Sequence, residues 1–159
     1  MKKVIRRGAA GDVEPMLDLA DAHRRQYAKF HPRFHRPAAA ARDAQRPFFE
    51  KLISDNSCIV LVSESEEGRL DGFLTGQLTA PPPVYDPGGA GCIVDDFALA
   101  SPEAWPIVGL GLLTELRWLA RERGAVQVIV VCAPEDEPKR VMLAGAGLSV
   151  VSEWLQGEL

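Results

Sequence analysis

Cys92-Ile-Val-Asp-Asp-Phe-Ala-Leu99 is the first of three neighbouring stretches that decide the fold of this chain; Pro106-Ile-Val-Gly109-Leu-Gly111 and the run Val126–Val131 follow it. The first and third stretches have the apolar, β-branched composition of strands. The middle one is a glycine-containing loop that opens an amphipathic helix ending at Gly124. Such a loop lets backbone N–H groups and the helix dipole meet a phosphate. This loop carries no lysine or arginine.

Shorter periodic segments surround this unit. Alternating and helical spacings of apolar residues predict, in chain order, a strand at Val4–Arg7, helices at Val13–Ala28 and Arg42–Ser54, strands at Cys58–Ser63 and Gly72–Leu78, and, after Val131, a short helix ending at Ala146 and a strand near Leu148–Trp154. The resulting order is β-α-α-β-β-β-α-β-α-β. It predicts an α/β (mixed α+β) fold with one mixed, mostly antiparallel sheet of six to seven strands and helices on both faces. Residues 1–159 are expected to form a single domain.

Composition restricts the class of protein. Among the 159 residues, 47% are apolar and 25% are charged, as in an ordinary soluble globular chain. No apolar run approaches the ~20 residues that span a bilayer, and no secretion signal is recognisable at the basic N-terminus. The three cysteines share no metal-ligand spacing, which favours free thiols in a reducing compartment. We therefore expect a cytoplasmic protein with no membrane partner.

Charge is unevenly distributed along the chain. Residues 1–51 hold twelve Lys and Arg against six Asp and Glu, so this segment is positive by six; since the net charge is −4, the remainder is negative by ten. The basic residues are spread along predicted helices and are not interleaved with aromatic residues. This pattern is typical of a solvated face, and no nucleic-acid partner is expected.

Five short motifs occur together in a fixed order that covers essentially the whole chain. They are Ile5-Arg6 with Asp12-Val-Glu14 and the helix through Met16–Ala20, Asp71-Gly72-Phe73-Leu-Thr-Gly76, Asp95-Asp-Phe-Ala-Leu99, Gly109-Leu-Gly111, and Gly147-Leu148. In this order and spacing the sequence resembles the GNAT superfamily of acyl-coenzyme-A-dependent N-acyltransferases. The resemblance implies transfer of an acetyl (acyl) group from acetyl-CoA to a primary amine by direct attack of the amine on the thioester.

The resemblance also implies a cofactor site. The pantetheine arm of the co-substrate acetyl-CoA is expected to lie between the two parallel strands and to pair with backbone like an added strand. The pyrophosphate is expected on N–H groups at the helix N-terminus. The residues implied for these contacts are Phe97, Ala98 and Leu99 for the arm, Val108, Gly109, Leu110, Gly111 and Leu112 for the pyrophosphate, and Asp136 and Lys139 for the nucleotide end. An alternative for Gly109 and Gly111 is that they only allow close helix packing.

Three positions depart from the family pattern. Pro106 stands where the pyrophosphate loop usually begins with Arg or Gln, Asp136 stands at the position of an Asn, and Leu143 stands at the position of a general-acid Tyr. An N-acyltransferase also needs a base to remove the proton of the acceptor ammonium. Asp95 and Asp96 are the candidates. Because side chains alternate along a strand, Asp95 is expected on the same face as Phe97 and Leu99, and Asp96 on the face of Val94 and Ala98. Asp95 is the favoured candidate for the base, and Asp96 is the weaker one.

The acceptor is expected to be a small-molecule amine or a protein amine, and the chain can form a homodimer. His31 and His35 are four residues apart, a spacing that could hold a metal ion on a helix, but Pro32 disfavours a helix there. Since no third ligand is evident either, no metal site is expected. A second interpretation stays open: a catalytically silent protein of the same fold that binds CoA or a protein partner. Pro106 and Leu143 are the residues that support it.

Overall fold

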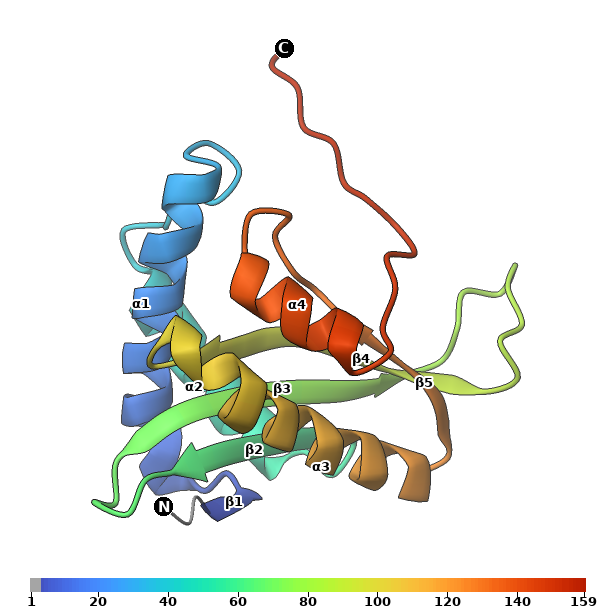
Figure 1. Cartoon of the computed structure of the whole chain (residues 1–159), viewed down its shortest axis with the longest axis horizontal. Coiled ribbons are helices and arrows are strands. Elements are labelled where there is room, and N and C mark those ends of the chain that lie inside the picture. Colours follow the sequence, from blue (N-terminus) through green and yellow to red (C-terminus); the bar gives the residue numbers. More distant parts are fainter. Residues whose placement is uncertain (1–3) are drawn as a thin grey trace.

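One five-stranded sheet organises the computed structural model, which describes residues 4–159. Its strands lie side by side in chain order: β1 (Val4–Arg7), β2 (Cys58–Glu64), β3 (Leu70–Thr79), β4 (Ala90–Leu99) and β5 (Ala125–Val130) (Figure 1). The first four strands pair antiparallel, and β5 pairs parallel to β4. The helix α3 (Leu110–Glu122) links β4 to β5, as a parallel connection requires.

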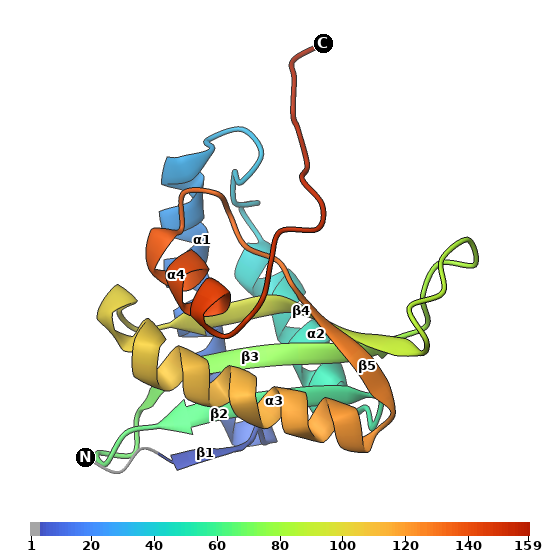
Figure 2. The same cartoon turned by 45° about the vertical axis from the view of Figure 1, so that its right-hand side comes forward.

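Helices cover both faces of the sheet (Figures 1 and 2). The helices α1 (Val13–Phe30) and α2 (Ala41–Ser54) lie on one face, and α3 (Leu110–Glu122) and α4 (Glu137–Gly145) lie on the other. Three short helical segments complete the list: Ala10–Asp12, Pro102–Ala104 and Trp105–Gly109. In the described residues, no helix combines the length and the apolar character that a membrane span needs.

Each face of the sheet has its own apolar core. Met16, Leu17 and Phe49 from α1 and α2 pack on Val60 and Phe73 of the sheet. On the other face, fully buried leucines of α3 pack with strand residues and with the inner side of α4; they are Leu112, Leu113 and Leu116. Burial of such side chains contributes about 2 kcal/mol each, so both helix pairs are held firmly against the sheet.

A β-bulge in β4 positions the residues that matter for function. Leu74 of β3 pairs with Phe97, whereas Gly76 pairs with Val94, so Thr75 alone opposes the two aspartates between them. The bulge adds a residue to β4 and bends the strand at this point.

Strands β4 and β5 separate where the bulge begins. Their paired register ends at Val94 and Val130, and the Val131 N–H donates a last hydrogen bond to the Val94 carbonyl (3.0 Å). Beyond that point β4 continues to Leu99, while the chain after β5 turns away toward α4 (Figure 2). We call the opening between residues 95–99 and residues 131–133 the fork.

The predicted sheet of six to seven strands is wrong: the described chain forms five strands. The missing strand is the one expected near Leu148–Trp154. After Gly147, which adopts a positive φ of 86°, the chain runs exposed and without regular structure toward the loop after α1 (Figure 1). Its contacts there are made by Trp154 with Phe34 (ring centroids 6.5 Å apart) and by Glu158 with Arg33 (2.8 Å). Residues of strand-forming composition form a strand only where they can pair with the edge of a sheet. The turn at Gly147 directs residues 148–154 away from the sheet.

Candidate functional site

The side chain of Lys139 fills the fork. Its ammonium donates hydrogen bonds to the Val131 carbonyl (3.0 Å) and to the Phe97 carbonyl (3.4 Å), so it joins the two strands where their backbone pairing has ended. The ammonium also lies over the rings of Phe97 and Trp105, 5.3 and 5.5 Å from their centroids. Lys139 is 1% exposed, which makes it a buried cation held by carbonyl dipoles and aromatic faces.

Burial lowers the pKa of Lys139, because the charged ammonium loses its hydration. The acidic groups that oppose this effect come from two parts of the chain: Asp96 on β4, and Cys132 and Asp136 on the connection between β5 and α4. His23 of α1 is the remaining titratable group that interacts with this ammonium.

The two candidate bases have different surroundings. Asp95 is exposed, whereas Asp96 is partly buried and accepts a hydrogen bond from the Gln45 amide of α2 (3.2 Å). Burial and, to a smaller extent, the charge of Asp95 raise the pKa of Asp96 to about 6, against the opposing effects of Arg24 and Lys139. Asp96 is therefore the carboxyl whose proton affinity suits proton transfer near neutral pH.

The bulge interrupts the alternation of side chains between the two faces of β4, so the expected grouping does not hold along the whole strand. Val94 and Phe97 belong to the same core on the α3–α4 face although they are three positions apart, and Ala98 belongs to the opposite core. The expected grouping of Val94 with Ala98 is therefore wrong. Asp96 lies on the α1–α2 face, as its bond to Gln45 shows. An extra residue in one strand shifts every later side chain to the other face.

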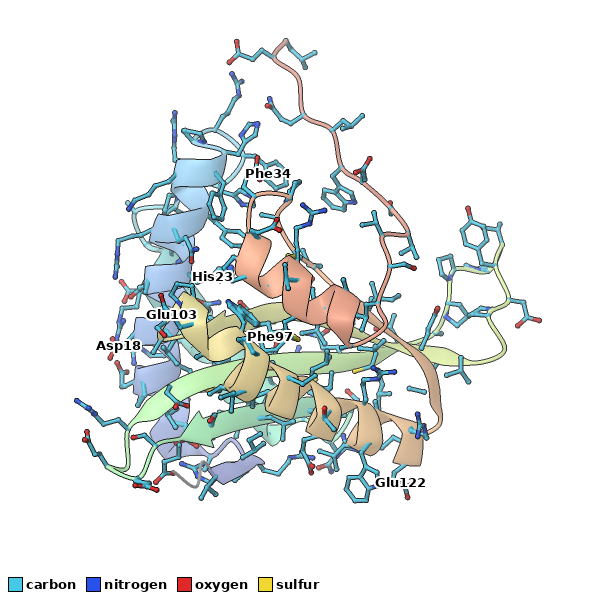
Figure 3. The ribbon with its side chains drawn as sticks, viewed as in Figure 1. Asp18, His23, Phe34, Phe97, Glu103 and Glu122 are labelled. Atoms are coloured by element: carbon cyan, nitrogen blue, oxygen red, sulfur yellow. The ribbon has the colours of Figure 1, made fainter. Side chains whose placement is uncertain are left out.

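A small cavity of about 100 Å³ adjoins the fork. His23 and Gln26 of α1 line one side, and Leu99, Ser101, Trp105 and Asp136 are among the residues that line the rest. His23 lies on the side of α1 that faces this region (Figure 3). Burial, followed by the charge of Lys139, lowers the pKa of His23 to about 4, so this imidazole is neutral at physiological pH.

A buried hydrogen bond fixes the wall of this cavity. The Tyr27 hydroxyl of α1 donates to Asp136 Oδ2 (2.8 Å) and accepts from the Ala133 N–H (3.3 Å). Burial and the adjacent Asp136 raise the pKa of Tyr27, so the phenol keeps its proton. The contact ties α1 to the start of α4 and holds that side of the fork in place.

The glycine segment differs from its expected form. Gly109 ends the short helical segment Trp105–Gly109, and Gly111 lies in the first turn of α3, so both glycines are helical and no loop separates them. The Leu110 N–H is bonded to the carbonyls of Ile107 and Trp105. The predicted helix agrees with α3, which begins at Leu110, but the predicted loop is wrong, because helical segments lead from Pro102 into α3.

Close packing accounts for these two glycines. A Cβ on Gly109 would lie 2.5 Å from Cε3 of Trp105, and one on Gly111 would lie 2.8 Å from Cδ1 of Ile5. Val108 and Leu112 are buried in the core, and Leu110 is the large side chain of this stretch that is exposed. The contact of residues 108–112 with a pyrophosphate stays a prediction.

The residues at the start of α4, where the nucleotide end is expected, differ in their burial. Asp136 and Lys139 both point inward, whereas Arg140 is exposed and donates to the Pro134 carbonyl (2.9 Å). Leu143 is buried in the core next to α3. Asp136 and Lys139 are both buried, and their contact with the nucleotide end of a cofactor stays a prediction.

Sequence reasoning missed the position of Lys139 in the fork and the contact of Gln45 with Asp96. The first had a visible signal: Lys139 precedes the buried Met142 and Leu143 by three and four residues, so it shares the inner face of α4. The second had none, because Gln45 and Asp96 meet through tertiary packing of α2 on the sheet.

No protein-family model and no curated protein matches the sequence. The structure matches that of a mutant of the BH1408 protein from Bacillus halodurans with a TM-score of 0.86, at 11% identity over 98% of this chain and 99% of that one. An aminoglycoside 6'-N-acetyltransferase from Acinetobacter baumannii matches with 0.75, at 9% identity over 99% and 98%. A predicted acetyltransferase with acetyl-CoA from Clostridium acetobutylicum matches with 0.73, at 15% identity over 99% and 96%. The chain therefore shares the fold of these acetyltransferases, which confirms the fold implied by the sequence resemblance apart from the number of strands.

Proposed function

We propose that this chain is an acyl-CoA-dependent N-acetyltransferase that transfers an acetyl group from acetyl-CoA to a primary amine. One observation carries the proposal: β4 continues beyond its pairing with β5, and the same segment holds a carboxyl whose pKa is raised. The fold that the chain shares with acetyltransferases supports it.

The unpaired edge of β4 suits the amide groups of a pantetheine arm. Among residues 4–159, this edge has no strand partner on the β5 side from Phe97 to Leu99, because the β5 pairing stops at Val94. An extended chain with amide groups pairs with such an edge as an added strand would. The Lys139 ammonium already donates to one of these acceptors, the Phe97 carbonyl, so a bound arm and Nζ would share this oxygen.

Asp96 is the base in this proposal. A primary amine arrives mostly as an ammonium ion and has to lose a proton before it attacks the thioester. The Asp96 carboxylate, on the face covered by α1 and α2, accepts that proton, and Gln45 orients it through their hydrogen bond. Asp95 adds negative charge that raises the proton affinity of Asp96.

A dedicated acid is not required for the leaving group. Leu143 has no proton to give, and the Tyr27 hydroxyl is bound to Asp136 and holds its proton firmly. The leaving group is a thiolate, whose conjugate thiol has a pKa near 8.5, so it departs as an anion and takes a proton from solvent.

A second candidate function is a silent module of the same fold that binds a protein partner or CoA without turnover. The observation that favours it is the occupation of the fork by Lys139, together with helical glycines in place of a phosphate loop. Glu103 also places a negative charge in the first turn of the helical path, where a phosphate would be repelled.

Calorimetric titration with acetyl-CoA tests the proposal. We expect saturable binding of one equivalent, and release of free thiol when a panel of primary amines is added. Desulfo-CoA is the matched control, since it lacks the acyl group and the sulfur that carries it but keeps the pantetheine arm and the nucleotide. Failure to bind acetyl-CoA at millimolar concentration contradicts the enzyme proposal; binding with no thiol release for any amine supports the silent module.

A further inference from the structure

Lys139 has no role in the proposed transfer, yet it is a buried amine at the point where the acyl donor has to lie. We propose that Lys139 is a self-acylation site, at which the chain takes an acetyl group from the thioester onto its own Nζ. This inference rests on the proposed function for the position of the donor.

The geometry brings the amine and the donor together. An arm that pairs with β4 uses the Phe97 carbonyl, and the Lys139 Nζ is already 3.4 Å from the oxygen of that carbonyl. A group bound to the same oxygen lies within contact of Nζ. Lys29 and Lys51 are exposed on α1 and α2 and have no such acceptor in common with the donor. Proximity of this kind raises the rate of an acyl transfer by orders of magnitude.

The surroundings also favour a nucleophilic amine. Nζ is removed from water by the rings of Phe97 and Trp105, and desolvation lowers its pKa, so more of it is uncharged than of a surface lysine. Asp96, Cys132 and Asp136 act against this effect, and His23, which interacts with the same ammonium from α1, is neutral.

The chemistry of the step is balanced. The free Nζ amine attacks the thioester carbon, a C–N bond forms, the C–S bond breaks, and the proton lost by nitrogen ends on the released thiol. The product is a neutral amide that keeps one N–H, which can still donate to the Val131 carbonyl. Trp105, whose ring lies under Nζ, also lines the cavity of about 100 Å³ next to the fork.

Acylation would change the fork permanently. The product has lost the positive charge that interacts with Asp96, and one donor replaces three. An acetylated Lys139 also fills the space that the next donor molecule needs. The modified chain is therefore expected to release less thiol with an external amine than the unmodified chain does.

Mass spectrometry of the full chain after incubation with acetyl-CoA tests the inference. We expect one acetyl group per chain, mapped to Lys139, at a level roughly tenfold or more above Lys29 and Lys51 in the same sample. Lys139→Arg removes the adduct, and Lys29→Arg, the matched control on the surface, leaves it in place. Lys139→Met serves as a second variant if the bulkier arginine prevents folding.

The outcomes separate this inference from the proposed function. Binding of acetyl-CoA without an adduct on Lys139, or with equal acetylation of all lysines, overturns self-acylation alone. Absence of acetyl-CoA binding overturns the proposed function. In that case S-acetyl-N-acetylcysteamine, a thioester without phosphates, is the probe: preferential acetylation of Lys139 supports a reactive amine in the fork, and acetylation no greater than at Lys29 overturns it.

Discussion

Asp95 and Asp96 are adjacent in sequence and differ in the property that a catalytic base needs. One is exposed to water; the other is partly buried, bound to Gln45, and has a pKa raised to about 6. The β-bulge opposite Thr75 causes the difference, because it turns Asp96 toward α2.

Replacement of Asp96 by asparagine removes the proposed base and keeps the side-chain shape. We expect Asp96→Asn to lower turnover with a fixed amine by roughly 100-fold, since loss of a general base has an effect of that order. In the wild type, activity should rise with pH through about 6, where the Asp96 carboxyl loses its proton. Thiol release measured between pH 5 and 8 checks both expectations.

Asp95→Asn is the matched control for that experiment, because it makes the same chemical change one residue away. We expect it to lower turnover far less and to shift the pH midpoint downward, since the Asp95 charge helps to raise the pKa of Asp96. Equal damage from the two substitutions, or greater damage from Asp95→Asn, contradicts the assignment of the base.

His23 predicts a specific pH dependence of stability. Its pKa is about 4 in the folded chain and near 6.5 when unfolded, so between these values the unfolded chain binds a proton that the folded chain does not. Stability therefore falls as pH decreases from about 6.5 to about 4. Asp96 acts oppositely in the same range, because its raised pKa makes the folded chain bind the extra proton.

A comparison with His23→Gln isolates the histidine from that opposing effect. Between pH 7 and 4 we expect the wild type to lose about 2 kcal/mol of unfolding free energy relative to the variant. Urea denaturation at several pH values gives this difference. A difference that stays constant over the range means that His23 is not buried in solution.

At the scale of elements, the helical path from Pro102 to Glu122 determines how Gly109 is interpreted. The sequence placed this glycine in a phosphate loop, and the structure places it against the Trp105 ring. The two roles have different consequences for a variant, because close packing concerns stability and a phosphate site concerns ligand affinity.

Gly109→Ala tests which role applies. A new Cβ would lie 2.5 Å from the Trp105 ring, so we expect the free energy of unfolding to fall by about 1–3 kcal/mol. Gly145→Ala in α4 is the control: nothing lies within 4 Å of its new Cβ, and stability should stay the same or rise by up to about 1 kcal/mol. Unchanged stability of Gly109→Ala with weakened acetyl-CoA binding would instead support a phosphate site.

The elements themselves were largely predictable from the sequence. Apolar alternation and helical spacing located the strands β1 to β5 and the helices α1 to α4, since these patterns record which face each element buries. Three features were not predictable, because each depends on contacts between distant segments: the bulge, the helical segments that begin at Pro102, and the lack of a strand at residues 148–154. The same holds for the site: the aspartate pair was found, but its geometry depends on Gln45 and Lys139.

At the scale of the whole molecule, the segment after Leu148 is exposed along its whole length. Trp154 is 85% exposed, and the ion pair between Arg33 and Glu158 lies in solvent, where such pairs contribute about 0–1 kcal/mol. In the described residues β5 pairs with β4 alone, so its outer edge is open.

Removal of residues 149–159 should therefore change the free energy of unfolding by less than about 1 kcal/mol, as measured by urea denaturation. A loss of about 2 kcal/mol or more would show that the segment pairs with another strand in solution. Sedimentation of the full and shortened chains tests in the same samples whether the segment contributes to the predicted homodimer.

The fork between β4 and β5 is central to the account, since the donor site, the base and the reactive lysine all meet there. Backbone amide NMR during titration with acetyl-CoA tests it most directly. We predict that the largest shifts occur at residues 96–99 and 131–133, on the two sides of the fork, together with the start of α4. Binding whose shifts avoid both sides of the fork, or no shifts at saturating ligand, would contradict the account.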